Sequence, residues 1–221
     1  MTGFLEIDSI YKRFSYKEIL TNIYLKCGKG DIIGILGRNG SGKTTLLKII
    51  FGIESAENKF VRINGKVTSK AYLKGNLKYL PAHHFMPMNL KVSDVMRLFS
   101  TTGQVEMLLS EPQMKNIIGK RIRQLSGEQL RYVEIKAILN SNADFILMDE
   151  LFSGLAPVMI EEILKDIKES SKDKGIILTD HDYRNILKIS DNIYLLKETV
   201  LKPIQNRKQL VTEGYLLDHM L

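Results

Sequence analysis

The first third of the chain alternates apolar and polar residues in several short stretches. Residues 5–7 and 23–27 follow this two-residue period, which predicts antiparallel strands with one buried face. Residues 60–63 and 66–68 have the same character, and the Asn-Gly pair between them (residues 64–65) suits a type I′ hairpin turn, because both residues tolerate a positive φ. We therefore expect an antiparallel β subdomain near the N-terminus.

Short apolar runs without alternation dominate the rest of the chain, and helical patterns separate most of them. A continuous apolar run is typical of a strand that is buried on both faces. The runs lie at residues 31–36, 77–80, 145–148, 175–178 and 193–196, and the helical patterns at residues 45–51, 128–139 and 158–170. Strands that alternate with helices predict right-handed crossovers, so the expected fold is α/β with a mainly parallel core sheet.

The pattern changes between residues 82 and 124, where β-branched residues become rare. Apolar side chains recur with helical spacing over residues 92–99, and Ser93 is placed to cap that helix. The preceding loop, residues 83–88, contains phenylalanine and two methionines. Methionine is flexible and polarisable, so this loop suits either an adaptable partner surface or ordinary packing.

The length of 221 residues is enough to bury roughly 70% of the surface of the unfolded chain. We expect one domain with two lobes, a core lobe over residues 1–81 and 141–221 and a helical lobe over residues 82–140. The single cysteine, Cys27, excludes an internal disulfide and suits a reducing compartment. Acidic side chains among residues 1–8 argue against a signal peptide, and no apolar run approaches the ~18 residues of a membrane span.

The net charge of +7 is compatible in principle with a nucleic acid or a membrane surface as partner. The lysines and arginines are scattered, however, and their densest cluster, at residues 120–123, lacks the interleaved aromatic side chains of a single-strand binding platform. A solvated surface explains this charge, so we expect no direct nucleic-acid partner.

Residues 37–45 place three glycines, a lysine and two threonines between an apolar strand and a helix, and match G-x-x-x-x-G-K-[ST] in full. Glycines allow backbone N–H groups to surround a phosphate, and the helix N-terminus adds roughly half a positive charge. Lys43 would reach the β- and γ-phosphates, and the Thr44 hydroxyl would hold Mg²⁺. A glycine turn before an ordinary helix is the alternative. The expected nucleotide-binding residues are Gly37, Arg38, Asn39, Gly40, Ser41, Gly42, Lys43, Thr44 and Thr45.

Two carboxylates, Asp149 and Glu150, follow the apolar run at residues 145–148. Ligands collect at the carboxyl ends of parallel strands, so we expect this strand to neighbour the one that leads into the phosphate loop. Asp149 would bind Mg²⁺ through water, and Glu150 would polarise the attacking water as general base. An acidic strand end with only a structural role is the alternative, and the phosphate loop earlier in the chain favours the chemical role.

Residues 125–129, Leu-Ser-Gly-Glu-Gln, open the helix that follows the helical lobe. Ser126 at the N-cap and Gln129 at the third helical position form a capping box. A capping box gives no reason for Gly127, because glycine weakens a helix, whereas a small residue at a helix N-terminus suits a second phosphate contact. We therefore expect Ser126, Gly127, Glu128 and Gln129 to contact nucleotide.

Taken together, these motifs resemble the ATP-binding cassette (ABC) ATPases over nearly the whole chain. The set comprises the phosphate loop, the Leu-Ser-Gly-Glu-Gln signature, Asp149-Glu150 and a strand that ends in Thr-Asp-His at residues 179–181. P-loop kinases and GTPases are excluded, because we find none of their lid or base-recognition motifs. The resemblance implies a P-loop NTPase fold of the ABC type, with an N-terminal antiparallel β subdomain and a short helical subdomain.

The resemblance also implies a function. The chain would be the ATP- and Mg²⁺-binding ATPase subunit of a transporter, closing on a second cassette in a homodimer whose ATP lies between one phosphate loop and the other signature. It would power a separate transmembrane permease subunit from the cytoplasmic side, peripheral on the inner face of the cell membrane. Phe14 would stack on adenine, and His181 would contact the γ-phosphate, unless it is an incidental histidine. Cassettes of lipopolysaccharide exporters and branched-chain amino-acid importers are the nearest in pattern.

Two positions depart from the family pattern. Ala82 stands where cassettes usually carry a glutamine that touches Mg²⁺ and the attacking water, and His83 or His84 is the available substitute. Ala156 stands where the family usually has an aspartate that links the two sites of the dimer. Two alternatives therefore stay open beside the transporter subunit: a soluble, nucleotide-gated scaffold or assembly factor without a transport role, and a weakly hydrolysing regulatory cassette.

Overall fold

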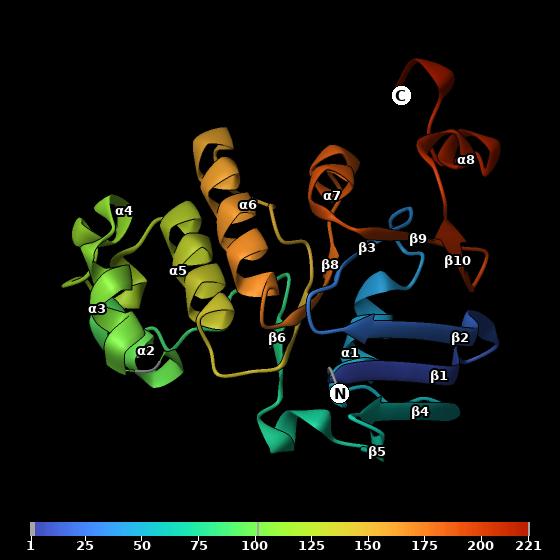
Figure 1. Cartoon of the computed structure of the whole chain (residues 1–221), viewed down its shortest axis with the longest axis horizontal. Coiled ribbons are helices and arrows are strands. Elements are labelled where there is room, and N and C mark those ends of the chain that lie inside the picture. Colours follow the sequence, from blue (N-terminus) through green and yellow to red (C-terminus); the bar gives the residue numbers. More distant parts are fainter. Residues whose placement is uncertain (1–2, 101, 221) are drawn as a thin grey trace.

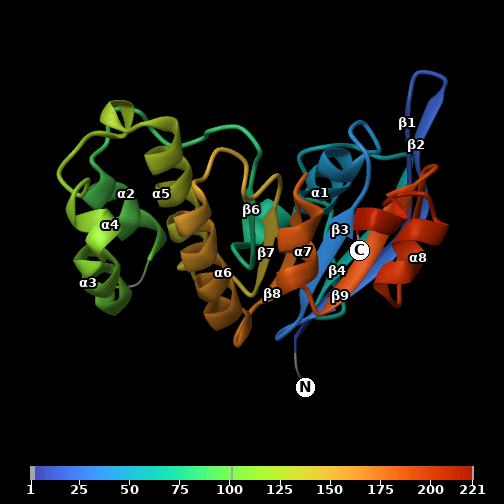
Figure 2. The same cartoon turned by 90° about the horizontal axis from the view of Figure 1, so that it is seen from above.

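This computed structural model describes residues 3–100 and 102–220, which form two β-sheets, a group of helices and the loops that connect them (Figure 1). The green helices of the middle of the chain lie at one end of the molecule, and the antiparallel sheet of the N-terminal region lies at the other. Between them stands the parallel core sheet, and Figure 2 shows its strands flanked by helices on the side of the helical lobe.

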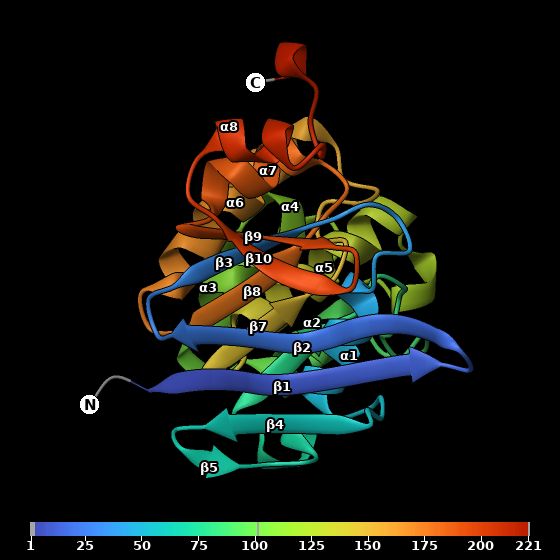
Figure 3. The ribbon, with the colours of Figure 1, turned by 90° about the vertical axis from the view of Figure 1, so that its right-hand side faces the viewer.

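The four-stranded sheet confirms the expected antiparallel β subdomain (Figure 3). Its order is β2-β1-β4-β5, and it comprises β1 (Phe4–Phe14), β2 (Lys17–Gly28), β4 (Asn58–Ile63) and β5 (Lys66–Val67). Leu5 and Ile7 are fully buried, as the alternation predicts. The predicted hairpin turn is also present, because Asn64 and Gly65 have φ values of 52° and 77°.

The six-stranded core sheet has the order β10-β9-β3-β8-β7-β6 and is parallel except for β10 at its edge. Its strands are β3 (Ile32–Leu36), β6 (Leu77–Leu80), β7 (Phe145–Met148), β8 (Gly175–Thr179), β9 (Asn192–Lys197) and β10 (Val200–Ile204). The apolar pattern did not predict β10, which contains Pro203. Proline lacks a backbone donor and is tolerated on an edge strand such as this one.

One expectation about the sheet is wrong. The strand before Asp149 does not neighbour the strand before the phosphate loop, because β8 lies between β7 and β3 and pairs with both. Ile176 of β8 is opposite Ile32 on one side and Ile146 on the other. The carboxyl ends of the three strands still meet at one edge of the sheet, so side chains that follow β3, β7 and β8 remain within reach of one another.

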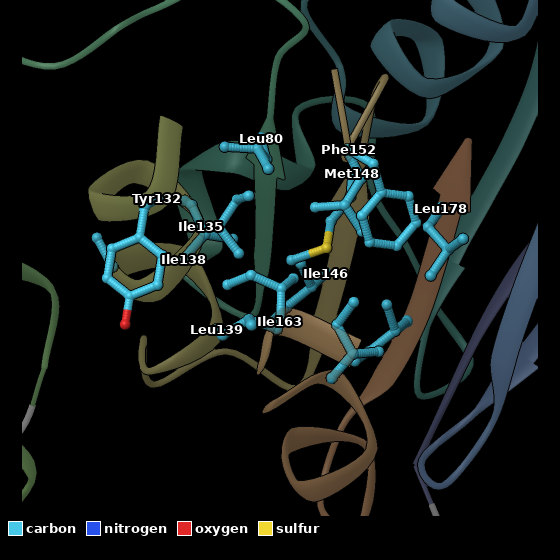
Figure 4. Packing of buried hydrophobic residues seen from close by; sticks show 14 of the residues in the cluster. Leu80, Tyr132, Ile135, Ile138, Leu139, Ile146, Met148, Phe152, Ile163 and Leu178 are labelled. Carbon is cyan, nitrogen blue, oxygen red and sulfur yellow. The ribbon is translucent and has the colours of Figure 1, made fainter. Parts of the chain in front are cut away.

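The core strands bury apolar side chains on both faces, which explains their continuous apolar sequence. Alternate residues of each strand enter two separate clusters. In β7, Ile146 and Met148 face the helical side, whereas Phe145 and Leu147 face the antiparallel sheet. Figure 4 shows the first cluster, in which sheet residues pack against side chains of the signature helix and the helix that follows it, among them Ile135, Ile138, Leu139 and Ile163.

Eight α-helices and three 3₁₀ turns complete the described residues. The α-helices are α1 (Lys43–Phe51), α2 (Val92–Phe99), α3 (Thr102–Ser110), α4 (Pro112–Lys115), α5 (Gly127–Leu139), α6 (Pro157–Ser171), α7 (Tyr183–Ile189) and α8 (Arg207–Thr212). The 3₁₀ turns are Ala71–Lys74, Ile122–Gln124 and Asp218–Met220. The predicted helices correspond to α1, α2, α5 and α6, and the apolar pattern did not predict the other four.

The expected cap of α2 is wrong. The N-cap is Lys91, which makes no capping side-chain bond, and Ser93 lies inside the helix. The first backbone N–H groups are satisfied by main chain instead, because Val92 donates to the carbonyl of Lys120 at 3.0 Å and Ser93 to that of Ile118 at 3.1 Å. A neighbouring segment thus performs the task for which a capping side chain is expected.

The loop at residues 83–88 serves both ordinary packing and an exposed surface, the two roles that its sequence suits. Met86 is buried in the core and Phe85 packs partly against it, so ordinary packing accounts for these two residues. Met88 is 52% exposed and is the part of the loop that remains available to a partner.

Candidate functional site

The phosphate loop connects β3 to α1 through two glycines whose backbone is left-handed, Gly40 with φ 74° and Gly42 with φ 108°. A side chain at Gly42 would also lie 2.9 Å from Ile19. Gly42 is the N-cap of α1 and provides no side-chain acceptor, so the first N–H groups of this helix point into the loop without a capping side chain. This arrangement leaves backbone N–H groups at a helix N-terminus free of side-chain caps, as in anion-binding sites.

The ammonium group of Lys43 lies inside this loop. Its Nζ donates to the carbonyl of Gly37 at 2.6 Å and to that of Arg38 at 3.3 Å. Burial lowers the pKa of Lys43, and the carboxylates of Asp149 and Glu150 oppose that shift. The hydrogen bonds of this ammonium group go to backbone carbonyls of the loop, and a phosphate bound there would offer it a charged acceptor.

Asp149 is fully buried at the end of β7 and accepts three hydroxyl hydrogen bonds. Thr44 donates to its Oδ1 at 3.1 Å, Thr179 to the same oxygen at 2.9 Å, and Tyr79 to its Oδ2 at 3.1 Å. Burial raises the pKa of Tyr79, so its hydroxyl remains a donor. Three elements, α1, β6 and β8, thus converge on the carboxylate that follows β7, and this carboxylate bridges the phosphate-loop helix and the core sheet.

Glu150 and His181 face each other next to this carboxylate. Glu150 Oε1 lies 2.9 Å from His181 Nε2, and both side chains are partly exposed. The backbone of Glu150 is left-handed, with φ 49°, which is rare for a residue other than glycine. The acid and the histidine that the sequence singles out therefore meet in space from the ends of two adjacent strands.

A cavity of about 440 Å³ joins most of these groups. Its lining includes Phe14, Ile19, Glu150, His181 and residues 39–45. Phe14 ends β1 with 48% of its surface exposed, and the ammonium group of Lys12 lies 4.5 Å from the centre of its ring. An aromatic ring at one end and a phosphate loop with two acid–base groups at the other suit a nucleotide.

The signature residues do not line this cavity. Residues 126–129 begin α5, which Figure 2 shows well separated from α1. The predicted capping box is present: Ser126 Oγ accepts from the N–H of Gln129, and Gln129 Oε1 accepts from the N–H of Ser126, both at 3.2 Å. A side chain at Gly127 would meet nothing within 4 Å. The fold of this chain therefore does not require the glycine.

The two departures from the family pattern lie at surfaces. Ala82 is exposed, and His84 is engaged elsewhere, because its Nδ1 lies 3.0 Å from Glu134. The N–H of Ala156 donates to Glu128 Oε1 at 2.6 Å, so a carboxylate of the signature does approach this position.

Sequence reasoning missed three residues that hold the site. Tyr79 supports Asp149, as described above. Arg131 and Glu134 of α5 are almost fully buried and contact the segments that follow β6 and β7. Their signal in the sequence is a pair of opposite charges three residues apart inside an otherwise apolar stretch of a helix, a spacing that puts both on one face.

None of the helices in residues 3–100 and 102–220 has the length and apolar character that a membrane-spanning helix requires. The α/β fold and the phosphate-loop cavity define the class of the protein as a P-loop nucleotide-binding protein. Residues 20–153 match the family model described as ABC transporter, so the chain belongs to the ABC transporter family. It is the ATP-binding subunit of an ABC transporter, an ATPase whose hydrolysis is coupled to transport.

Curated relatives agree with this assignment. The chain is 29% identical to an uncharacterized ABC transporter ATP-binding protein of Methanocaldococcus jannaschii, covering 88% of this chain and 74% of the relative. It is 27% identical to the lipopolysaccharide export system ATP-binding protein LptB of Escherichia coli (strain K12), covering 88% and 87%. The expected similarity to lipopolysaccharide-export cassettes is thus confirmed, whereas the similarity to branched-chain amino-acid importers stays a prediction.

Solved structures support the fold. An ATP-binding subunit of an ABC transporter superposes with a TM-score of 0.84 at 20% identity, covering 96% of this chain and 94% of the other. A bacterial Atm1-family ABC exporter with ATP bound gives a TM-score of 0.81 at 18% identity, covering 97% of this chain and 41% of the exporter. The expected ABC-type fold, with its antiparallel N-terminal sheet and mainly parallel core sheet, is confirmed.

Proposed function

We propose that the cavity between Phe14 and Glu150 is where the subunit binds and hydrolyses ATP. Phe14 stacks on the adenine, and the loop at residues 37–45 surrounds the phosphates with backbone N–H groups and the ammonium group of Lys43. The observation that carries this proposal is the single cavity, because the aromatic ring, the phosphate loop, the acid and the histidine all line it.

The donor atoms next to the cavity suit Mg²⁺. The Thr44 hydroxyl and the Asp149 carboxylate are oxygen ligands, which Mg²⁺ prefers, and they already lie 3.1 Å apart. Magnesium usually binds through one or two protein oxygens together with substrate phosphates and water. Thr44 would hold the ion directly and Asp149 through water, and the bound ion would neutralise charge on the β- and γ-phosphates.

Glu150 is the proposed general base. Its Oε1 would accept a proton from the water that attacks the γ-phosphate, and its place at the cavity wall supports this role. The contact with His181 at 2.9 Å supports a second step. When the γ-phosphate arrives, the imidazole turns to it and releases the carboxylate for the water.

The signature supplies the other half of the site from a second copy of the chain. Gly127 is open to solvent in this subunit, and residues 126–129 lie outside the cavity of their own chain. Both observations support a head-to-tail homodimer, in which each helix N-terminus of α5 closes over the ATP of the other copy. A separate transmembrane permease would take up this movement, with the cassette peripheral on the cytoplasmic face of the membrane.

A weakly hydrolysing regulatory cassette is the second candidate. Ala82 and Ala156 favour it, because neither side chain can contact water or a partner through a polar group. The intact Glu150–His181 pair and phosphate loop favour the competent enzyme. The transporter relatives argue against a soluble scaffold without a transport role.

The experiment is Glu150→Gln. Removing the general base should slow ATP hydrolysis by about 10²-fold or more and trap an ATP-bound dimer, detectable by light scattering. Glu198→Gln is a matched control, because Glu198 has the same left-handed backbone, with φ 50°, but does not line the cavity. If the wild type hydrolyses ATP well above the background rate and Glu150→Gln keeps that rate, Glu150 is not the base. A wild type whose own hydrolysis does not exceed the background rate would favour the regulatory cassette.

A further inference from the structure

The backbone of Glu150 is the most unusual feature of the site. Its φ of 49° lies in the left-handed region, where a residue with a side chain is strained. Such strain persists only where the surrounding structure imposes it. The contacts that hold this peptide therefore also decide where the Glu150 carboxylate points.

Arg131 makes three of these contacts. Its guanidinium donates to the carbonyls of Asp149 and Glu150, both at 2.9 Å, and to the carbonyl of Leu151 at 3.4 Å. A fourth bond, to the carbonyl of Pro81, is 2.7 Å long and ties the loop after β6 to the same group. One planar side chain thus holds three consecutive peptide units around the strained residue.

Glu134, one turn further along α5, balances the charge of this arginine. Glu134 Oε2 lies 3.6 Å from Arg131, and both residues are buried, with Arg131 only 2% exposed. The carboxylate also accepts from the N–H of Phe85 at 2.9 Å and lies 3.0 Å from His84 Nδ1. Through Arg131 and Glu134, α5 therefore forms hydrogen bonds both to the segment after β6 and to the segment that carries the base.

We propose that Arg131 is a positioning residue for Glu150, which it holds in the left-handed conformation that directs its carboxylate into the cavity. The proposal rests on the proposed function of Glu150 as the base. Arg131 does not line the cavity, so it acts through Glu150. Thr179 assists it by accepting from the N–H of Glu150 at 3.2 Å.

Arg131→Lys separates this role from a purely structural one. Lysine keeps the positive charge beside Glu134, but its three donors radiate from one atom and cannot span three carbonyls as the guanidinium fork does. A small displacement of a catalytic group has a large kinetic effect, so kcat should fall roughly 10- to 100-fold. KM and the ATP affinity measured by calorimetry should stay within about twofold, because the phosphate loop is unchanged.

A double-mutant cycle with Glu150→Gln gives the decisive readout. If Arg131 acts through Glu150, Arg131→Lys should not reduce the residual hydrolysis of the Glu150→Gln protein any further. The same fold loss in both backgrounds, or a loss of ATP affinity, would overturn the proposal. Lys136→Arg is the control, since Lys136 is the other buried cation of α5, and its ammonium group contacts Glu111, Asp166 and the ring of Tyr132 and not the segment that carries Glu150; it should keep the wild-type kcat.

Two further arrangements keep the test decisive. If Arg131→Lys does not fold, Glu134→Gln replaces it, because glutamine preserves the shape and removes the charge that holds Arg131. The same double-mutant cycle then applies. Glu134→Gln should lower kcat in the protein that retains Glu150 and should not lower it further in the Glu150→Gln protein. If Glu150→Gln itself hydrolyses ATP at the wild-type rate, the proposed base and this inference fail together. If Glu150→Gln is slow and Arg131→Lys lowers kcat by the same factor with and without Glu150→Gln, only the proposed role of Arg131 is refuted.

Discussion

Two corners of this molecule carry motifs of equal clarity in sequence but of different completeness in structure. In the phosphate corner (residues 37–45, Asp149, Glu150 and His181), side chains from separate strands and loops contact one another. Residues 39–45, Glu150 and His181 border one cavity, and Asp149 lies buried next to it. In the signature corner (residues 126–129), the polar groups bond within their own capping box or to Ala156. The folding of one chain is enough to assemble the phosphate corner, whereas the signature corner remains available for contact with another molecule.

The strongest way to break this comparison is Lys43→Ala. The substitution removes the buried ammonium group that would meet the phosphates, and charge-assisted hydrogen bonds contribute about 1.5–3 kcal/mol each, so ATP binding measured by calorimetry should weaken at least about 100-fold. Lys174→Ala is the matched control. Its ammonium group is also desolvated and donates to a backbone carbonyl, that of Leu139, away from the cavity. Unchanged affinity in Lys43→Ala would mean that the phosphate corner is not the nucleotide site.

Gly127→Val tests the other corner with a smaller expected effect. A side chain here meets nothing in this subunit, so the free energy of unfolding should change by less than about 0.5 kcal/mol, and ATP binding by the single chain should persist. A valine between the signature and a bound phosphate would clash with the second copy, so ATP-dependent dimerisation and hydrolysis should fall more than about tenfold.

Gly119→Val provides the control for this substitution. Gly119 is exposed, and a side chain there also meets nothing within 4 Å, but it lies outside both corners. It should leave dimerisation and hydrolysis unchanged. If Gly127→Val dimerises with ATP as the wild type does, then no second copy packs closely against the signature corner. A contact with a second copy would then no longer explain why the signature corner lies apart from the cavity.

The sequence predicted those parts of the fold that depend on consecutive residues. Alternation in residues 5–7, the Asn64-Gly65 turn and the buried strand at residues 145–148 are local consequences of side-chain chemistry, and the structure contains all three. The order of strands is not local. Nothing in the apolar runs indicates that β8 separates β3 from β7, because every buried parallel strand has the same apolar character.

The site divides in the same way. The groups expected around the phosphates could be proposed because each motif is a short run with its own chemistry. The groups that hold them were missed, because Tyr79 and Arg131 act across 70 and 18 residues of sequence on Asp149. Ser93 shows the converse error: a serine in a suitable position does not cap when main chain already satisfies the helix. Tertiary contacts override local preference at such positions.

The smallest expected effect concerns Ser126 and asks whether the signature corner is more than a capping box. Ser126→Ala removes one side-chain cap, which should cost about 1 kcal/mol in the free energy of unfolding measured by denaturant titration. Asn206→Ala offers a close match, because Asn206 caps α8 with the same geometry, accepting from a glutamine N–H three residues on at 3.1 Å. Both variants should lose similar stability, and only Ser126→Ala should weaken ATP-dependent dimerisation. Equal dimerisation in the two variants would reduce Ser126 to a cap and leave Gly127 and the exposed helix N-terminus as the whole of the signature contact.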